Sequence, residues 1–201
     1  MGRGVFIALE GIDGSGTSSQ RTALATALRG RGHEVLETYE PSSGSIGRLA
    51  RSRLATDAVP LDRRALALLF AADRLDHVAT EIEPALATGT VVLSDRYLMS
   101  SWVYQALDCD PQWVREINRF APWPDLTFVL DVGAAEAMRR VAGRAGTEEI
   151  YETTPLQERL AAGYAGFARD PSLARVQRID GSRSMAEVTA LLLDACIAAG
   201  L

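Results

Sequence analysis

The chain contains no lysine, so all 21 of its basic residues are arginine. They are outnumbered by 26 acidic residues, which leaves a formal net charge of −5 at pH 7. Non-specific binding to nucleic acid needs a basic surface, and this charge balance argues against it. We therefore expect no nucleic-acid partner. The lysine bias runs through the whole chain, yet arginine was available wherever a positive charge is needed.

Cysteine and histidine are also scarce. Cys109 and Cys196 lack metal-ligand spacing, and we expect them to be reduced thiols of a cytoplasmic protein. His33 and His77 have no triad-like partners and no metal spacing, so we interpret both as structural. No apolar run approaches the length of a membrane span, and the first strand begins within a few residues of Met1. We therefore expect no membrane association and no signal peptide.

Short apolar segments alternate with amphipathic ones along the chain. This alternation is typical of a parallel sheet covered by helices on both faces. With 201 residues, the chain has room for one well-buried domain but not for two comfortable ones. The expected fold class is α/β, a three-layer α/β/α sandwich in a single domain spanning 1–201. The expected strands are 5–9, 35–38, 91–94, 126–131 and 174–179, and the expected helices are 18–29, 46–55, 62–87, 100–107, 111–120, 134–143, 156–168 and 184–199.

A glycine-rich turn joins the first expected strand to the first expected helix. Gly11, Gly16 and Ser18 match the phosphate-loop pattern G-x-x-x-x-G-K-[ST], in which backbone N–H groups and a helix N-terminus hold an anion. Ser18 is then placed to put its hydroxyl on Mg²⁺. The pattern fails at Thr17, which stands where the pattern has lysine. A plain tight turn is the competing interpretation of the same glycines.

Asp95 and Arg96 directly follow an apolar strand. Open α/β sheets bind ligands at the carboxyl ends of their strands. There a carboxylate can hold the water shell of a metal ion, and a guanidinium suits a two-pronged contact with phosphate. An isolated Asp-Arg pair would more simply be a surface pair, but a phosphate loop upstream favours the functional interpretation.

Two further sets of residues are candidates for contacts with a nucleotide. Phe70 and Arg74 lie four apart on one helix face, where a ring and a guanidinium can grip a base, although Phe70 alone is more readily a core residue. Arg139, Arg140 and Arg144 flank a polar, glycine-containing stretch at 143–154 that we expect to be mobile. A charge run is usually a solvated face, but a mobile arginine-bearing flap can also deliver cations to a phosphoryl group.

With these residues in place, the chain resembles the thymidylate kinases, which are nucleoside-monophosphate kinases of the phosphate-loop class. The resemblance covers nearly the whole chain, and its motifs are specific through their order and spacing rather than singly. They are EGIDGSG at 10–16, EP at 40–41 with Arg51, FAADR at 70–74 with His77, PAL at 84–86, DRY at 95–97, SS at 100–101 with YQ at 104–105, and PDLT at 124–127 leading to LDV at 130–132.

The resemblance implies the sheet and short lid of these kinases, and transfer of the ATP γ-phosphoryl group to dTMP in dTTP biosynthesis, with Mg²⁺ and in a homodimer formed through the long helices. The implied metal residues are Ser18 and Asp95. The implied ATP-binding residues are Gly11, Ile12, Asp13, Gly14, Ser15, Gly16, Thr17, Ser18 and Ser19. The implied dTMP-binding residues are Asp13, Glu40, Arg51, Phe70, Arg74, Arg96, Ser100, Ser101, Tyr104 and Gln105, with Phe70 stacked on thymine and Arg74 bonded to its edge. The implied catalytic residues are Asp13, Asp95, Arg96, Arg140 and Arg144.

Two departures from the family pattern remove positive charge. Thr17 replaces the loop lysine, and Ile150 stands at an arginine position of the lid. Since the loop itself carries no arginine, the chain resembles the family members whose catalytic arginine lies in the lid, here at about 143–154. We expect Arg140 and Arg144 to take over the charge role lost at Thr17. Two alternatives remain open, namely a catalytically weak or silent nucleotide-binding homologue and a kinase for another pyrimidine deoxynucleoside monophosphate.

Overall fold

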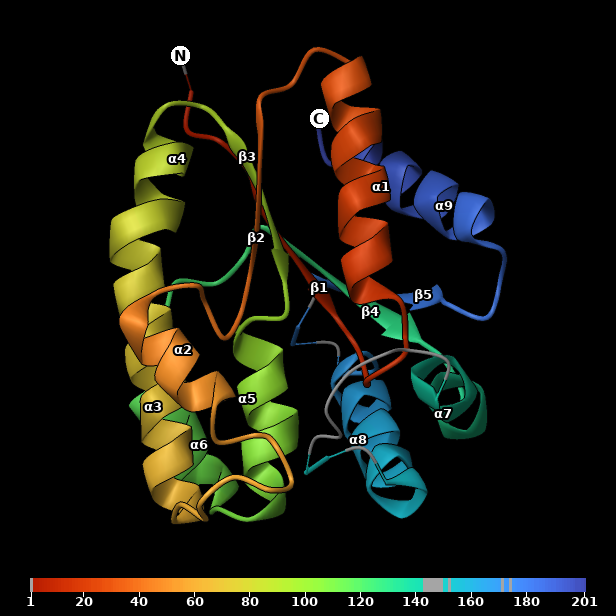
Figure 1. Ribbon diagram of the computed structural model, residues 1–201. Helices are drawn as coiled ribbons and strands as arrows, with labels where there is room; N and C mark the ends of the chain where they lie inside the picture. Colours follow the sequence, from red (N-terminus) through yellow and green to blue (C-terminus); the bar gives the residue numbers. More distant parts are fainter. Residues whose placement is uncertain (1, 143–149, 152, 171, 174) are drawn as a thin grey trace.

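The computed structural model describes residues 2–142, 150–151, 153–170, 172–173 and 175–201 (Figure 1). Its centre is a five-stranded parallel sheet with the strand order β2-β3-β1-β4-β5. The α/β fold and the parallel sheet are therefore confirmed. The strands are β1 (Phe6–Glu10), β2 (Val35–Tyr39), β3 (Val91–Asp95), β4 (Leu126–Asp131) and β5 (Val176–Asp180).

Helices cover both faces of the sheet, because alternate side chains of the buried strands point to opposite sides. Ile7 and Leu9 of β1 pack in one core cluster with Leu24 of α1 (Thr17–Gly30) and Leu192 of α9 (Met185–Ala198). Phe6 and Ala8 of the same strand pack in another cluster with the helices of the opposite face. Figure 1 shows α1 and α9 on one side of the sheet and the column of α3 and α4 on the other.

The expected long helix over 62–87 is a continuous helical column in three parts. Asp62 caps it, accepting hydrogen bonds from the backbone N–H groups of Arg64 and Ala65. The column comprises α3 (Arg63–His77), a π-helical turn (Val78–Ile82) and α4 (Glu83–Ala87). The remaining helices are α2 (Ser45–Arg51), α5 (Leu98–Tyr104), a 3₁₀ turn (Gln105–Leu107), α6 (Pro111–Ile117), α7 (Ala134–Ala142) and α8 (Thr154–Phe167).

Several expected boundaries were wrong. The helix expected over 46–55 ends at Arg51, where i→i+3 hydrogen bonds from Arg53 to Ala50 and from Leu54 to Arg51 tighten the last turn and close it. The helices expected to run to 107 and 120 likewise end at Tyr104 and Ile117. Most of the expected lid, 143–149 and 152, lies outside the described residues. No helix in the described part of the chain is both long and apolar enough to span a membrane.

Candidate active site

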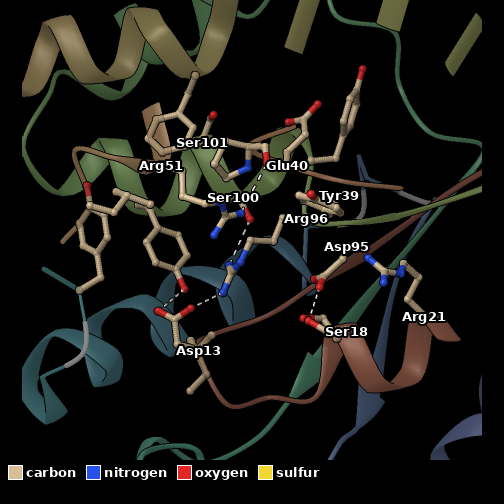
Figure 2. A pocket seen from close by; sticks show the side chains of 18 of the residues that line it. Asp13, Ser18, Arg21, Tyr39, Glu40, Arg51, Asp95, Arg96, Ser100 and Ser101 are labelled. Atoms are coloured by element: carbon tan, nitrogen blue, oxygen red, sulfur yellow. Dashed lines mark hydrogen bonds and ion pairs between the residues drawn. The ribbon is translucent and has the colours of Figure 1, made fainter. Parts of the chain in front are cut away.

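A cavity of about 740 Å³ opens at the carboxyl ends of β1, β2 and β3 (Figure 2). One side, here called the loop wall, is formed by 12–14 and 16–19 together with Arg21 and Asp95. The opposite side, the helix wall, is formed by residues of α3 and α5. The predicted site residues that line the cavity are Ile12, Asp13, Gly14, Gly16, Thr17, Ser18, Ser19, Glu40, Arg51, Phe70, Arg74, Asp95, Arg96, Ser100, Ser101, Tyr104, Gln105 and Arg140.

The glycine turn has the geometry of an anion-binding loop. Gly14 and Gly16 have φ angles of 82° and 98°, a left-handed region that favours glycine. A side chain at Gly14 would also clash, since its Cβ would lie 2.2 Å from the carbonyl oxygen of Ala137. α1 begins at Thr17, and its N-cap, Gly16, makes no side-chain capping bond. The first N–H groups of the helix therefore face the cavity without a side-chain cap and are available to an anion.

Ser18 and Asp95 meet at the base of the loop wall, as the sequence predicts for a metal site. The hydroxyl of Ser18 donates a hydrogen bond to Oδ2 of Asp95. The other carboxylate oxygen, Oδ1, is buried and has no hydrogen-bond partner among the described residues. An unpartnered buried carboxylate oxygen beside a hydroxyl fits a hard cation such as Mg²⁺. The described residues contain no group of three or more acidic, histidine or cysteine side chains that could hold a metal, so such an ion would need water and substrate phosphates as further ligands.

Arg96 and Asp13 form the corner where the two walls join. Arg96 has a φ of 69°, which is uncommon outside glycine and typical of strained functional positions. Its guanidinium donates to the carbonyl of Gly11 at 2.9 Å and to Asp13 at 2.5 Å, and it lies 4.9 Å from the ring centre of Tyr104. Asp13 also accepts from the hydroxyl of Tyr104 at 3.2 Å and from Gln157 at 2.9 Å. The corner thus presents a guanidinium that is held from several sides.

Glu10 fixes the turn that carries Arg96, a role that sequence reasoning did not assign. It is fully buried, and it accepts hydrogen bonds from the backbone N–H groups of Tyr97 and Ser100 and from the hydroxyls of Ser100 and Tyr164. Burial raises the pKa of this carboxyl, against the lowering effect of the hydrogen bond from Ser100 and of the Arg96 charge. The position of Glu10 at the end of a buried strand was the sequence feature that could have indicated this role.

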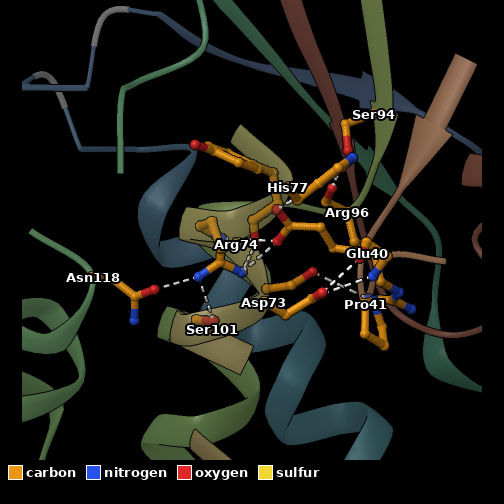
Figure 3. A network of polar contacts seen from close by, with 12 residues as sticks. Glu40, Pro41, Asp73, Arg74, His77, Ser94, Arg96, Ser101 and Asn118 are labelled. Carbon is orange, nitrogen blue, oxygen red and sulfur yellow. Dashed lines mark hydrogen bonds and ion pairs between the residues drawn. The ribbon is translucent and has the colours of Figure 1, made fainter. Parts of the chain in front are cut away.

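Arg74 is placed differently from the expectation that it bonds a base edge. It is 2 % exposed, and all three of its guanidinium nitrogens are directed at protein acceptors (Figure 3). Nε donates to Glu40 at 2.8 Å, Nη1 donates to Ser101 at 2.9 Å and also to Asn118, and Nη2 donates to the Tyr97 carbonyl at 3.0 Å. Nη2 also lies 2.7 Å from Glu40, so all five N–H groups are directed at the protein and a contact with a base would require one of these partners to be given up. Direct bonding to the base therefore stays a prediction.

Glu40 links this network to His77. It accepts from Arg74 and lies 3.3 Å from Nδ1 of His77, whose Nε2 lies 2.7 Å from the hydroxyl of Thr38 and 2.8 Å from Glu81. Burial lowers the pKa of His77, but the hydrogen bonds and charges of Glu40 and Glu81 outweigh it, and the net direction is upward. The structural role expected for His77 agrees with its buried position beside the π-helical turn.

The arginines of α7 and the lid are only partly described. Arg140 lines the cavity, but its Nε donates to Glu136 at 2.9 Å and its terminal nitrogens lie 3.3 Å from the carbonyl of Gly181. Arg139 pairs with the same glutamate and is largely exposed. Arg144 lies outside the described residues. Tyr151, at the far end of the expected lid, is buried against the cavity, 5.1 Å from Tyr104 between ring centres.

The cavity also brings in residues that sequence reasoning missed. Arg21 follows Ser18 by three positions on α1, so helical spacing was a signal for it. Tyr39 is the last residue of β2 and could have been found as a strand end. Two of the expected ATP-binding residues, Gly11 and Ser15, do not line the cavity. The missed lining residues are Arg21, Tyr39, Pro41, Leu54, Tyr97 and Tyr151.

Comparison with known proteins identifies the family of the chain. A family model described as thymidylate kinase matches residues 9–192. The chain is 43% identical over 173 residues to a probable thymidylate kinase of Thermococcus gammatolerans, covering 82% of this chain and 83% of the relative. It is 41% identical over 198 residues to the thymidylate kinase of Ruegeria pomeroyi, covering 94% and 92%. A phosphate loop that faces a polar nucleotide-sized cavity, and matches of this extent, place the chain in the thymidylate kinase family.

Proposed function

We propose that the chain transfers the γ-phosphoryl group of ATP to dTMP, giving ADP and dTDP. An oxygen of the dTMP phosphate attacks the γ-phosphorus, and the bond from that phosphorus to the oxygen bridging to the β-phosphate breaks as ADP leaves. The observation that carries the proposal is a single cavity in which an uncapped phosphate loop faces the Asp13–Arg96 corner. Positioning and charge are most of what this reaction asks of a protein.

The loop wall is assigned to ATP and the corner to the acceptor phosphate. Uncapped N–H groups at the start of α1 bind phosphate oxygens. Arg96, already aimed into the cavity by Gly11 and Asp13, holds the phosphate of dTMP with a two-pronged contact. Arg51, which also lines the cavity, assists it from α2. Arg140 acts on the transferring group only after leaving Glu136.

Ser18 and Asp95 would hold Mg²⁺, and their geometry fits it. The ion would neutralise charge on the phosphate oxygens that it contacts. The protein's own part is to hold the hydroxyl and the carboxylate together and to keep one carboxylate oxygen unpartnered in the described structure.

The helix wall is assigned to the thymine ring and the sugar. Phe70 is partly buried and lines the cavity, so its ring is open to stacking. Arg74, four residues further along α3, holds Ser101 in place from behind the wall. Ser100, Ser101, Tyr104 and Gln105 then line the base and the sugar.

Release of ADP by the purified chain, with ATP, Mg²⁺ and a panel of nucleoside monophosphates, tests this function. We expect saturable ADP release with dTMP and weaker release with other pyrimidine monophosphates. Measurable dTMP binding without turnover would instead support the silent homologue, which the loss of charge at Thr17 and Ile150 favours. A higher rate with another pyrimidine deoxynucleotide would reassign the acceptor.

We also propose that the chain is a cytoplasmic homodimer. Leu68 and Leu75 are 49% and 38% exposed and lie seven residues apart, so they share one face of α3. Such a face suits helix packing against a second copy. Free Cys109 and Cys196 suit a reducing compartment. Sedimentation equilibrium tests the dimer, and a monomer across micromolar concentrations would refute it.

A further inference from the structure

Because Thr17 stands at the position of the loop lysine, another side chain must supply positive charge near the phosphates. Of the cationic side chains that line the cavity, Arg74 is held behind the helix wall, Arg96 pairs with Asp13, and Arg140 pairs with Glu136. Arg51 belongs to α2, which packs against α3, and is assigned above to the acceptor phosphate; its guanidinium lies 5.8 Å from the centre of the Tyr39 ring, which the Arg21 guanidinium approaches at 5.9 Å. Arg21 lies on the loop wall itself (Figure 2).

Arg21 lies close to the Ser18–Asp95 pair for two independent reasons. It follows Ser18 by three residues on α1, so the two side chains share a helix face. Its Nη1 lies 3.2 Å from the carbonyl oxygen of Thr38. The next residue, Tyr39, is the register partner of Asp95 on the adjacent strand, and adjacent strands are only about 4.8 Å apart.

Arg21 donates to the carbonyl of Thr38 and lies over the Tyr39 ring, but its ion pair with Glu37 is loose and can be exchanged. Its Nε lies 3.4 Å from Glu37, which is at the long end for an ion pair with hydrogen bonding. Arg29 reaches the same carboxylate at 2.8 Å, and Thr22 donates to it at 3.1 Å. Arg21 can therefore leave Glu37 without stranding that carboxylate. Its side chain already lines the cavity and is 19% exposed, so it can contact a ligand there without a large rearrangement.

We propose that Arg21 supplies charge that Thr17 leaves out, by contacting phosphate oxygens of the bound nucleotide beside Ser18 and Asp95. This inference rests on the proposed phosphoryl transfer. A planar guanidinium suits phosphate oxygens, and its position one helical turn beyond the usual lysine calls for a long side chain. The contact lies beside the proposed metal residues Ser18 and Asp95.

A purely structural role for Arg21 would be to tie α1 to β2. Arg29 does this in the same way, because it pairs with the same Glu37 and donates to the carbonyl of Val35 at 2.8 Å. Arg29 does not line the cavity. Arg29→Ala is therefore the matched control for Arg21→Ala.

The test combines Arg21→Ala, Arg29→Ala and Thr17→Lys. We expect Arg21→Ala to lower kcat by on the order of 10²-fold, the lower range for losing one preorganised donor to phosphate, while KM for dTMP stays within about twofold. Arg29→Ala should keep wild-type kcat, and the two variants should melt alike. Thr17→Lys should restore most of the lost activity in the Arg21→Ala background but change the wild type little. Equal kcat for the two alanine variants, or an equal gain from lysine in both backgrounds, would overturn the proposal.

Binding of a non-hydrolysable ATP analogue with Mg²⁺ separates this proposal from the choice of acceptor. Arg21→Ala should bind the analogue about tenfold more weakly than Arg29→Ala, as expected for one lost charge-assisted contact. This result does not depend on whether dTMP is the acceptor. Unchanged analogue binding in Arg21→Ala would contradict the role of Arg21 even if dTMP turnover is confirmed.

Discussion

On the helix wall of the cavity, all three guanidinium nitrogens of Arg74 are directed at protein acceptors, whereas on the loop wall the buried Oδ1 of Asp95 meets no partner among the described residues. A buried polar group without a partner costs about 1–3 kcal/mol. The Arg74 guanidinium on the helix wall is therefore fully engaged by the protein alone. The loop wall is completed by what binds there, which is the expected division between a preformed nucleoside site and a site for metal and phosphates.

Arg74→Met removes the hydrogen bonds of the Arg74 guanidinium and gives the largest expected effect, a loss of stability. It leaves Glu40 buried without its main cation, which costs about 3–5 kcal/mol of unfolding free energy in comparable sites. Urea unfolding measures this, with Arg64→Met as the control, since Arg64 is largely exposed. A loss below about 1 kcal/mol for Arg74→Met would mean that the network contributes little to folding.

Arg96→Gln tests the corner where the walls meet. It removes the charge aimed at the acceptor phosphate while keeping a polar side chain. We expect kcat/KM for dTMP to fall by about 10²–10³-fold. Arg139→Gln, on an exposed residue of α7, should leave kcat/KM unchanged. A similar small effect in both variants would place the acceptor phosphate elsewhere.

Asp95→Asn tests whether the loop wall serves ligand binding rather than folding. It should weaken Mg²⁺-dependent binding of an ATP analogue by about 10–100-fold, as for other groups that orient a metal's ligands. Folding stability and dTMP binding should stay near wild-type values, because asparagine keeps one oxygen to accept from Ser18 and because Oδ1 of Asp95 has no hydrogen-bond partner in the described structure to lose. If Asp95→Asn instead destabilised the protein as strongly as Arg74→Met, the contrast between the walls would be wrong.

His77→Gln has the smallest expected effect, and it depends on pH. The pKa of His77 is raised because Glu40 and Glu81 together outweigh the effect of burial. Its contribution to stability is therefore fully present below the unfolded-state pKa of about 6.5 and is lost as pH rises through the folded-state value. The stability gap between wild type and His77→Gln should be larger at pH 6 than at pH 9. A gap that widens with pH would show that the imidazole is held neutral.

The sequence predicted what depends on local pattern. The strands, the glycine turn and the Ser18–Asp95 meeting follow from apolar runs, glycine spacing and the rule that parallel strands end at one edge. The hydrogen bonds that Arg74 donates within the protein could not be predicted, because its acceptors Glu40 and Asn118 lie 34 and 44 residues away in the sequence. The π-helical turn at 78–82 was likewise hidden, since its apolar spacing continues that of α3.

The most direct test of the account is the transfer of a labelled γ-phosphoryl group from ATP to dTMP by the wild-type chain, with Mg²⁺ present or chelated. Thr17 stands where the loop lysine would be, and arginine is proposed to supply the missing charge. We predict labelled dTDP that accumulates with Mg²⁺, saturates with dTMP and disappears on chelation. Absence of labelled dTDP at saturating dTMP and ATP, with both nucleotides bound, would contradict it.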